Sequence, residues 1–513
     1  ILDPSFLKFG GLTAMVFRLT RCERKLTWLF LLIAAAAVSS CQEVSEPQQK
    51  LPNIIVILAD DMGYGDITYY NQDSKIPTPN LSRLAEEGVA FTDAHSPSAV
   101  CTPTRYGLLT GRYAWRTRLK DGVLWGYSPA LIDPGRATLA FRLKELGYDT
   151  AAIGKWHLGL GLEDPVDYSK ALVPGPNSVG FDYFFGIPAS LDMDPYLYVE
   201  NERAVQLPTD HVAGSAHRRE SVGGFWREGP VSPDFRHIDV LPDLTAKAVE
   251  FVNERSGQES AEPFFLYWAL SAPHTPWVPT DEFRDRSKAG YYGDFCVQVD
   301  WSIGQLLAAV EELPDRDNTL VLFTSDNGSH WPTEDIEKFD HRANGIYRGQ
   351  KADIWEGGHR VPFIVRWPSQ ISSGSTSDQL VCHTDIFATV SELLGISLTA
   401  GEAEDSFSFL HALLGQSSRR SVREAIVHHS VDGMFSIRRG SWKLILGRGS
   451  GGFTDPRRIE PAPGEPAGQL YNLDDDPAET RNLYLEEAEL VEELTALLGK
   501  FQEQGLSRPL GLP

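Results

Sequence analysis

Two polar pairs, Asp60-Asp61 and Asp326-Asn327, each stand directly after a short apolar run. Either pair alone also suits a helix cap or a turn. If the two runs are neighbouring strands, three carboxylates and an amide oxygen gather at one edge of a sheet. The carboxylates then repel one another unless a cation lies between them. Oxygen ligands suit calcium or magnesium, so the pattern predicts a divalent metal site.

A reactive cysteine is the next candidate, in Cys101-Thr-Pro-Thr-Arg105. Pro103 suits the first turn of a helix, which would place Cys101 at the positive helix end with Arg105 one turn further on. Both features favour an ionised or anion-facing group at this position. A cysteine can equally be a small buried apolar residue, and the spacing alone does not separate these two interpretations.

Basic and imidazole groups follow other apolar runs. Lys155 and His157 are two residues apart, so they point the same way if the extended geometry continues. His274 lies between two prolines, and Lys351 ends the segment Arg-Gly-Gln-Lys. Each of these residues alone also fits a surface or structural role. Together with Arg105 and a metal, they would form a pocket in which cations hold a tetrahedral anion and imidazoles move protons.

The elements that must position these groups are read from the apolar runs. Continuous apolar runs of six to eight residues indicate strands buried on both faces, as in a parallel sheet. Amphipathic stretches between them indicate crossover helices and an α/β fold. Ligands bind beyond the carboxyl ends of such strands, so the polar groups are expected to converge there. The runs are 53–59, 149–154, 263–270 and 319–325, and the amphipathic stretches are 80–87, 139–146, 244–254 and 294–313.

The pattern changes towards the C-terminus. A strand-like run at 361–367 is followed, after about residue 418, by four short runs, a Gly/Pro-rich loop at 447–468 and an amphipathic stretch at 486–504. The short runs are 425–429, 435–438, 442–446 and 469–473. We therefore expect a large mixed, mostly parallel sheet between helices in residues 52–418, and a smaller α+β subdomain with an antiparallel sheet in residues 419–513.

The N-terminal region resembles an export signal. A basic region from Met15 to Lys25 precedes an apolar run at 28–38, which is too short for an ordinary transmembrane helix. Val38-Ser-Ser-Cys41 resembles a bacterial lipobox, in which the cysteine carries the lipid; an ordinary cleaved signal peptide is the alternative. We expect an upstream segment and signal in residues 1–40, a polar tether in residues 41–51, and a periplasmic or outer-membrane lipoprotein.

Composition narrows the function further. The 513 residues are 42% hydrophobic and 23% charged, as in globular proteins. A formal net charge of −23 argues against nucleic-acid binding, which needs a basic face. Of five cysteines, Cys22 falls in the signal and Cys41 in the lipobox. Cys296 and Cys382 form the only pair that would spare Cys101, and whether they pair stays open.

These motifs, in this order, closely resemble the formylglycine-dependent (type I) sulfatases of the alkaline phosphatase-like superfamily, which includes arylsulfatase A and N-acetylgalactosamine-6-sulfatase. The most specific part is Cys101-Thr-Pro-Thr-Arg105 followed by Gly-Leu-Leu-Thr-Gly-Arg112. The resemblance extends from about Asn53 to Leu483. The other matching motifs are Asp60-Asp61-Met-Gly-Tyr-Gly-Asp66, Gly154-Lys-Trp-His-Leu-Gly159, Pro273-His274, Ser325-Asp-Asn-Gly328, Arg348-Gly-Gln-Lys351 with Glu356-Gly-Gly, and Gln469-Leu-Tyr-Asn-Leu-Asp-Asp-Asp-Pro477.

The resemblance implies a modified nucleophile and a metal. A formylglycine-generating enzyme would oxidise Cys101 to formylglycine (3-oxoalanine), whose hydrate attacks sulfur. One Ca²⁺ would bind the sulfate and hydrate oxygens. Its implied ligands are Asp60, Asp61, Asp326, Asn327 and the modified Cys101.

The resemblance also implies roles for the five basic residues. Arg105 and Lys155 would stabilise the hydrate as an oxyanion. His274 and Lys351 would bind the sulfate and help to protonate the leaving oxygen. His157 would take a proton from the sulfated hydrate, which expels sulfate and regenerates the aldehyde.

The substrate implied is a sulfate ester on a carbohydrate, or an aryl sulfate. Hydrolysis of a phosphonate monoester or phosphodiester, and a catalytically silent glycan-binding lipoprotein, stay open as alternatives. Membrane contact is expected only through a lipid on Cys41. Three loops, 163–177, 192–231 and 281–292, show no interpretable pattern. Basic residues in the second loop could bind a sugar carboxylate or second sulfate, or could be a solvated charge run: His211, Arg218, Arg219 and Arg227.

Overall fold

The computed structural model describes residues 50–216, 224–257, 262–416 and 423–509. Residues from Leu51 onward form one compact unit. The predicted signal segment, Cys41 and most of the tether lie outside the described residues, as do Arg218 and Arg219. The domain boundary near residue 418 stays a prediction, because it falls in a segment that is not described.

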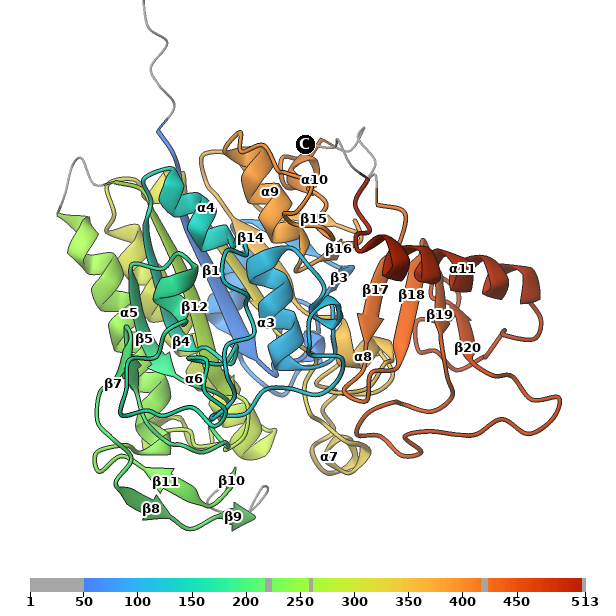
Figure 1. Ribbon diagram of the computed structural model, residues 1–513, viewed down its shortest axis with the longest axis horizontal. Coiled ribbons are helices and arrows are strands. Elements are labelled where there is room, and N and C mark those ends of the chain that lie inside the picture. Colours follow the sequence, from blue (N-terminus) through green and yellow to red (C-terminus); the bar gives the residue numbers. More distant parts are fainter. Residues whose placement is uncertain (1–49, 217–223, 258–261, 417–422, 510–513) are drawn as a thin grey trace, which may run out of the picture. The chain divides into compact units, whose positions relative to one another are not determined.

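A ten-stranded mixed sheet forms the centre of the unit (Figure 1), in the order β15-β2-β14-β13-β1-β12-β4-β5-β6-β7. The four runs predicted as buried strands are neighbours in this sheet, and all three pairings between them are parallel. They are β13 (Thr319–Ser325), β1 (Asn53–Asp60), β12 (Phe264–Pro273) and β4 (Asp149–Lys155). The sheet expected from the sequence is therefore confirmed, and β12 runs three residues beyond its predicted end.

The outer strands make the sheet mixed. β14 pairs antiparallel with both β13 and β2, while β5 continues the parallel set beside β4. These outer strands are β14 (Phe363–Arg366), β2 (Val89–Phe91), β15 (Ser375–Ser377), β5 (Tyr183–Ile187), β6 (Val199–Glu200) and β7 (Arg203–Ala204). A separate pair joins β3 (Ala94–His95) to β16 (Val381–Cys382).

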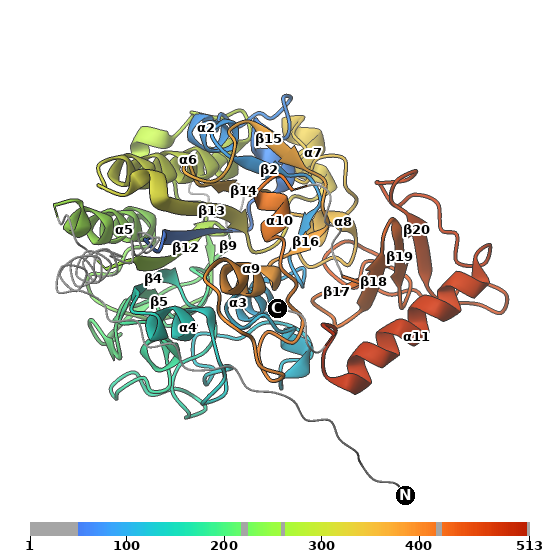
Figure 2. The ribbon, with the colours of Figure 1, turned by 90° about the horizontal axis from the view of Figure 1, so that it is seen from above.

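Helices cover both faces of the sheet (Figure 2). Alternate residues of β1 divide between two apolar cores: Ile54, Val56 and Leu58 pack in one, while Ile55 and Ile57 pack in the other. This is the alternation of a strand buried on both faces. The first core includes α3 (Cys101–Thr110), α4 (Leu139–Glu145) and α9 (Asp385–Leu393), and the second includes α2 (Pro79–Glu86), α5 (Val240–Ser256) and α6 (Gly290–Glu311).

The C-terminal region forms a four-stranded antiparallel sheet with one long helix, as the sequence predicts. Leu494 and Leu498 of the helix pack with Ile437 and Leu444 of the sheet and with Trp115 of the larger domain. The shared core therefore joins this sheet to the segment that follows α3. The elements are β17 (Ile426–His429), β18 (Phe435–Arg439), β19 (Trp442–Ile445), β20 (Gln469–Asn472) and α11 (Ala488–Gln504).

The second of the three loops without a sequence pattern, 192–231, carries two short antiparallel strand pairs. They are β8 (Asp210–Val212) with β11 (Gly229–Val231) and β9 (Ser215–Ala216) with β10 (Phe225–Trp226). Cys101, Cys296 and Cys382 are buried free thiols. Among the described residues, no helix is both long and apolar enough to span a membrane.

Candidate active site

The polar groups converge because their strands are adjacent. Asp60 ends β1, Lys155 ends β4, and Asp326 follows β13, so all three lie at the carboxyl edge of neighbouring strands. The Asp326 amide donates to the Ala59 carbonyl at 3.0 Å, and the Asp61 amide donates to Asp326 Oδ1 at 3.1 Å. These bonds continue the contact between β1 and β13 beyond the sheet and place the predicted ligands side by side.

Three buried carboxylates are each paired with a buried cation. Asp60 Oδ2 lies 2.7 Å from Lys155 Nζ, and Arg105 donates from Nη2 and Nε to Asp326 Oδ2 at 2.8 and 3.1 Å. Asp61 Oδ2 lies 2.8 Å from Nζ of a second lysine, Lys351. Burial would raise the pKa of Asp60, but Lys155, His274 and Arg105 together hold that pKa below its ordinary value. The pKa of Asp326 is raised, by burial and by Asp60.

Two buried oxygens fit a hard cation. Asp60 Oδ1 and Asn327 Oδ1 have no hydrogen-bond partner in the part of the chain that the structure describes. Asn327 is held in place by its Nδ2, which donates to Asp61 Oδ1 at 2.7 Å. A buried acceptor without a donor is costly, and a divalent cation bound by oxygens removes that cost. The predicted ligand set therefore fits calcium.

Cys101 begins α3, as predicted, and only 2% of its surface is exposed. Burial raises the pKa of the Cys101 thiol to about 11, although Lys155 and Lys351 act to lower it. The prediction of an anion-facing group stays open, but the helix end and the basic neighbours do not lower the pKa of the unmodified thiol below its ordinary value. The reason is that desolvation in this closed site outweighs the attraction of the neighbouring cations.

His157 does not continue the extended geometry of β4. Its φ of 55° is left-handed, so the predicted common direction of Lys155 and His157 is not found. Nε2 of His157 makes a 2.7 Å hydrogen bond with the Leu124 carbonyl, and Nδ1 is buried without a partner among the described residues. Burial, then Lys155 and Arg105, lower the pKa of His157 well below its ordinary value, so the imidazole is neutral.

His274 and Lys351 border a pocket of about 310 Å³ that Cys101 also lines. Lys351 Nζ bonds Asp61 Oδ2, and His274 Nε2 lies 3.6 Å from the same oxygen. His274 Nδ1 lies 2.7 Å from the Thr275 carbonyl, so it carries a proton and donates it there. Cys101, Asp61, His274 and Lys351 all line this pocket. Arg105, Lys155 and His157 lie behind it, fully buried.

The pocket wall contains residues that sequence reasoning missed. Trp125, Ser190 and Asp192 line it, and so does Arg227, whose guanidinium lies 4.8 Å from the centre of the Trp125 ring. Arg227 was among the uncertain basic residues of the second loop, whereas His211 of that group is exposed and does not line the pocket. The other wall residues follow no motif, so their positions emerge only when the loops fold over the sheet edge.

Two motif glycines allow the site to close. Gly154 has φ +124°, and a Cβ there would lie 1.8 Å from the Ala269 carbonyl of β12. A Cβ on Gly328 would lie 1.9 Å from the Gly357 carbonyl. The second contact presses the segment after Asn327 against the Glu356-Gly-Gly segment, so both glycines mark places where two backbones touch.

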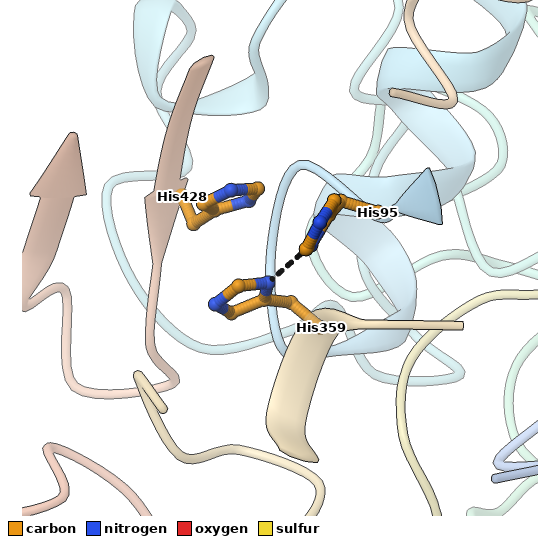
Figure 3. Close-up of side chains that lie close together, drawn as sticks. All are labelled: His95, His359 and His428. Carbon is orange, nitrogen blue, oxygen red and sulfur yellow. Dashed lines mark hydrogen bonds between the residues drawn. The ribbon is translucent and has the colours of Figure 1, made fainter. Parts of the chain in front are cut away.

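A second polar cluster, the histidine cluster of His95, His359 and His428, joins side chains from β3, α8 (Glu356–His359) and β17 (Figure 3). Lys443 Nζ donates to His359 Nε2 at 2.9 Å, so the His359 proton is on Nδ1, which donates to His95 Nδ1 at 3.0 Å. His95 Nε2 then donates to Asp93 at 2.8 Å. His359 and His428 stack with centroids 3.9 Å apart and planes at 10°, so their in-plane lone pairs do not converge on one point. The cluster fits a hydrogen-bonded network better than a metal site.

His428 of this cluster and its neighbour His429 connect the C-terminal sheet to the segment before Cys101. His428 Nδ1 donates to the Ser96 carbonyl at 2.9 Å, and the His429 carbonyl accepts from the Ala99 amide at 3.1 Å. Ser96 and Ala99 both lie within five residues of Cys101. Strand β17 therefore fixes the segment that leads into α3.

Two family descriptions match the chain. Residues 52–396 match the family described as Sulfatase, and residues 348–504 match the C-terminal family described as N-sulphoglucosamine sulphohydrolase, C-terminal. An N-acetylgalactosamine-6-O-sulfatase of Bacteroides thetaiotaomicron is 36% identical, over 91% of this chain and 97% of that protein. Human arylsulfatase A is 32% identical, over 84% of this chain and 83% of its own length.

A solved structure gives the same result. A sulfatase whose structure was determined in work on the metabolism of glycosaminoglycans by Bacteroides thetaiotaomicron superposes with a TM-score of 0.79 at 35% identity. The match covers 89% of this chain and all of that chain. The large mixed sheet, its two helical layers and the small C-terminal sheet therefore have a counterpart in a sulfatase of known structure.

Proposed function

The chain belongs to the sulfatase family and is a sulfuric ester hydrolase. We propose that it removes sulfate from a sulfated carbohydrate through a formylglycine made from Cys101. The observation that carries the proposal is that Cys101, His274 and Lys351 line one pocket together with Asp61 of the candidate metal site. That arrangement suits an anion whose oxygens must be held while one bond to sulfur breaks.

The charges of the site favour an anionic substrate once a metal is present. Three carboxylates are paired with three basic side chains, so their formal charges cancel without a metal. Asp60, Asp61, Asp326 and Asn327 would hold Ca²⁺. Bound calcium would supply electrostatic stabilisation of the sulfate oxygens. The site would then be positive, although the whole chain carries a net charge of −23.

Each basic residue has a position that suits a distinct task. Lys351 and His274 line the pocket and can hold sulfate oxygens, and a protonated His274 Nε2 can pass its proton to the leaving oxygen. Arg105 and Lys155 lie beneath, where they hold two of the carboxylates and stabilise negative charge at residue 101. His157, neutral with an unpartnered Nδ1 in the described structure, can accept the proton that is released when sulfate leaves.

The nucleophile requires the modification of Cys101. The thiol is protonated at neutral pH because its pKa is about 11, so it is a weak nucleophile in this pocket. A formylglycine hydrate would supply a hydroxyl that attacks sulfur and a second hydroxyl whose deprotonation allows sulfate to leave.

Expression with and without a formylglycine-generating enzyme tests the proposal. Mass spectrometry of the peptide that contains Cys101 should show the aldehyde only after co-expression, and hydrolysis of 4-nitrophenyl sulfate should appear with it. Cys101→Ala is the control and should stay inactive. A clear preference for phenyl phosphonates over aryl sulfate would contradict the proposal. An unmodified thiol without activity after co-expression would favour a binding role instead.

The carbohydrate part of the proposal has its own test. It is supported by the name of the Bacteroides relative, an N-acetylgalactosamine-6-O-sulfatase. Release of sulfate from a panel of sulfated mono- and disaccharides, headed by N-acetylgalactosamine 6-sulfate, should identify at least one sugar that is cleaved with a higher kcat/KM than 4-nitrophenyl sulfate. Hydrolysis of aryl sulfate alone would contradict it.

We also propose export as a lipoprotein with the lipid on Cys41, on the basis of Val38-Ser-Ser-Cys41 and the basic and apolar segments before it. Metabolic labelling with palmitate in a bacterial host should mark the full-length chain. The Cys41→Ala variant should lose the label, and labelling that persists in this variant would contradict the assignment.

A further inference from the structure

One wall of the pocket carries buried acceptors that the chemistry at sulfur does not use. Asp192 is 4% exposed, and its Oδ2 forms an ion pair with Arg227 Nη1. Its other oxygen, Oδ1, has no hydrogen-bond partner among the described residues. Ser190 Oγ, two residues earlier on the same wall, is also buried without one in that part of the chain. Buried acceptors of this kind are costly unless a donor from a ligand or water meets them.

The position of Asp192 relates it to the sugar rather than to the sulfate. Oδ1 lies 3.8 Å from His274 Nδ1, on the side of the imidazole away from Asp61, which is 3.6 Å from Nε2. The His274 proton on Nδ1 is donated to the Thr275 carbonyl, so it does not satisfy Asp192. A sulfate held at the Asp61 side of His274 would place the ring of the sulfated sugar beside Asp192. A carboxylate repels sulfate oxygens but accepts hydrogen bonds from hydroxyls.

The contacts around Asp192 hold its carboxylate in one position. Arg227 donates from Nη1 to the Asp192 carboxylate and also lies 3.3 Å from its main-chain carbonyl. The guanidinium lies 4.8 Å from the centre of the Trp125 ring and 5.3 Å from that of Phe225. Because its charge is compensated by Asp192, Arg227 is a poor candidate for binding a sugar carboxylate or second sulfate. Its contact with two aromatic rings restrains it to one position.

We propose that Asp192 is a specificity-determining residue: its Oδ1 accepts a hydrogen bond from a hydroxyl on the sugar residue that carries the sulfate. This inference rests on the proposed glycan sulfatase function and adds a residue that distinguishes a sugar from other sulfate esters. Arg227 acts as a positioning residue that holds the Asp192 carboxylate. Sites built to bind a hydroxyl discriminate strongly against ligands that lack it, because a buried acceptor is then left unpaired.

Asp192→Asn tests the proposal with almost no change of shape. The amide would turn its oxygen towards Arg227, which only donates, and so present its NH₂ group to the pocket in place of an acceptor. We expect kcat/KM for N-acetylgalactosamine 6-sulfate, or for the preferred sugar of the panel, to fall by roughly 10- to 100-fold. 4-Nitrophenyl sulfate has no hydroxyl, so its kcat/KM should change by less than about 3-fold. Asp234→Asn, an exposed aspartate of the same region, is the matched control and should change neither value.

Deoxy sugars identify the hydrogen bond itself. If one monodeoxy analogue of the preferred sugar reacts slowly with the wild type, Asp192→Asn should cause little further loss with that analogue. Equal losses of Asp192→Asn on the sugar and on aryl sulfate, or a shifted pH profile with aryl sulfate, would instead assign Asp192 to the support of His274 and overturn the inference. A wild type that cleaves aryl sulfate but no sulfated sugar would overturn the glycan function and the inference together.

Discussion

Residues of the active site act in pairs, and each pair is buried where water cannot replace a lost partner. Asp326 illustrates this, since it receives Arg105 on one oxygen and the Asp61 amide on the other. Removing one member of such a pair leaves the other uncompensated, which costs more than the pair contributes. Because these residues also line the candidate metal site, we expect a substitution to lower metal binding and activity as well as stability.

Asp326→Asn should weaken calcium binding by at least about 10-fold, because it removes one of the proposed carboxylate ligands and the charged partner of Arg105. Calcium added to the chelator-treated wild type should raise its melting temperature, since a ligand that binds only the native state stabilises it. The same addition should have little effect on Asp326→Asn. Asp73→Asn, at an exposed position, is the control. An undiminished calcium-dependent rise in Asp326→Asn would contradict the ligand assignment.

At the scale of elements, adjacent strands and short backbone contacts set the geometry of the site. β4 approaches β12 so closely at Gly154 that no side chain fits there. The C-terminal strand β19 contributes Lys443, which is fully buried between Glu356 at 3.0 Å and Glu479 at 2.9 Å. These contacts join elements that are far apart in the sequence, so they are weak points for substitution.

Gly154→Ala should destabilise the protein by about 3 kcal/mol or more, because its Cβ would meet a main-chain carbonyl that cannot move without disturbing the sheet. Gly499→Ala is the matched control in α11, where a Cβ has no neighbour within 4 Å. This control should raise the free energy of unfolding by about 1 kcal/mol, since alanine favours a helix more than glycine does. Thermal and urea unfolding measure both effects. Similar small effects of the two changes would show that the strands can separate at Gly154.

Lys443→Met should lower the free energy of unfolding by about 3–5 kcal/mol, because it leaves the buried Glu479 carboxylate without its cation, beside the carboxylate of Glu356. Burial and Glu356 already hold the pKa of Glu479 near 7 even with Lys443 present. Lys247→Met breaks a surface ion pair with Glu250 of 3.0 Å and should cost less than about 1 kcal/mol. Urea unfolding compares the two. Equal losses of unfolding free energy in the two variants would mean that the charge of Lys443 does not stabilise the C-terminal sheet.

At the scale of the whole molecule, buried neutral histidines make stability depend on pH. Burial lowers the pKa of His95, His359 and His428 below the ordinary value, and lowers that of His383 to about 3 and that of His429 to about 4. The unfolded chain binds protons at about pH 6.5, before the native histidines do. Stability should therefore be complete above about pH 6.5 and should fall as the pH decreases below that value.

His428→Asn should make this decline less steep, by up to about 1.4 kcal/mol per pH unit, because one histidine with a lowered pKa is removed. The asparagine can still donate to the Ser96 carbonyl, and the groups that act on His428, namely His95, Lys443 and Glu356, stay in place. Urea midpoints at intervals from pH 8 to pH 5 measure the slope. His211→Ala, at an exposed position, is the control. Parallel curves for the wild type and His428→Asn would contradict the prediction.

The sequence alone predicted the main elements and the convergence of the candidate site residues. The apolar runs predicted β1, β4, β12 and β13 because a strand buried on both faces must be apolar throughout. Asp60 and Asp326 were predicted to meet because polar residues that end adjacent parallel strands share one edge. The order of the motifs indicated the sulfatase family, and the family resemblance implied roles for the site residues.

Only the tertiary structure decided the environment of each group and the pocket wall. The left-handed backbone of His157 and the raised pKa of Cys101 depend on what surrounds them, which periodicity does not encode. Asp192 and Trp125 follow no motif in the sequence, and only the folded chain shows that they line the same pocket. The physical reason is that a strand is specified by its own alternation of side chains, whereas desolvation, charge pairing and a pocket arise between residues that the chain separates.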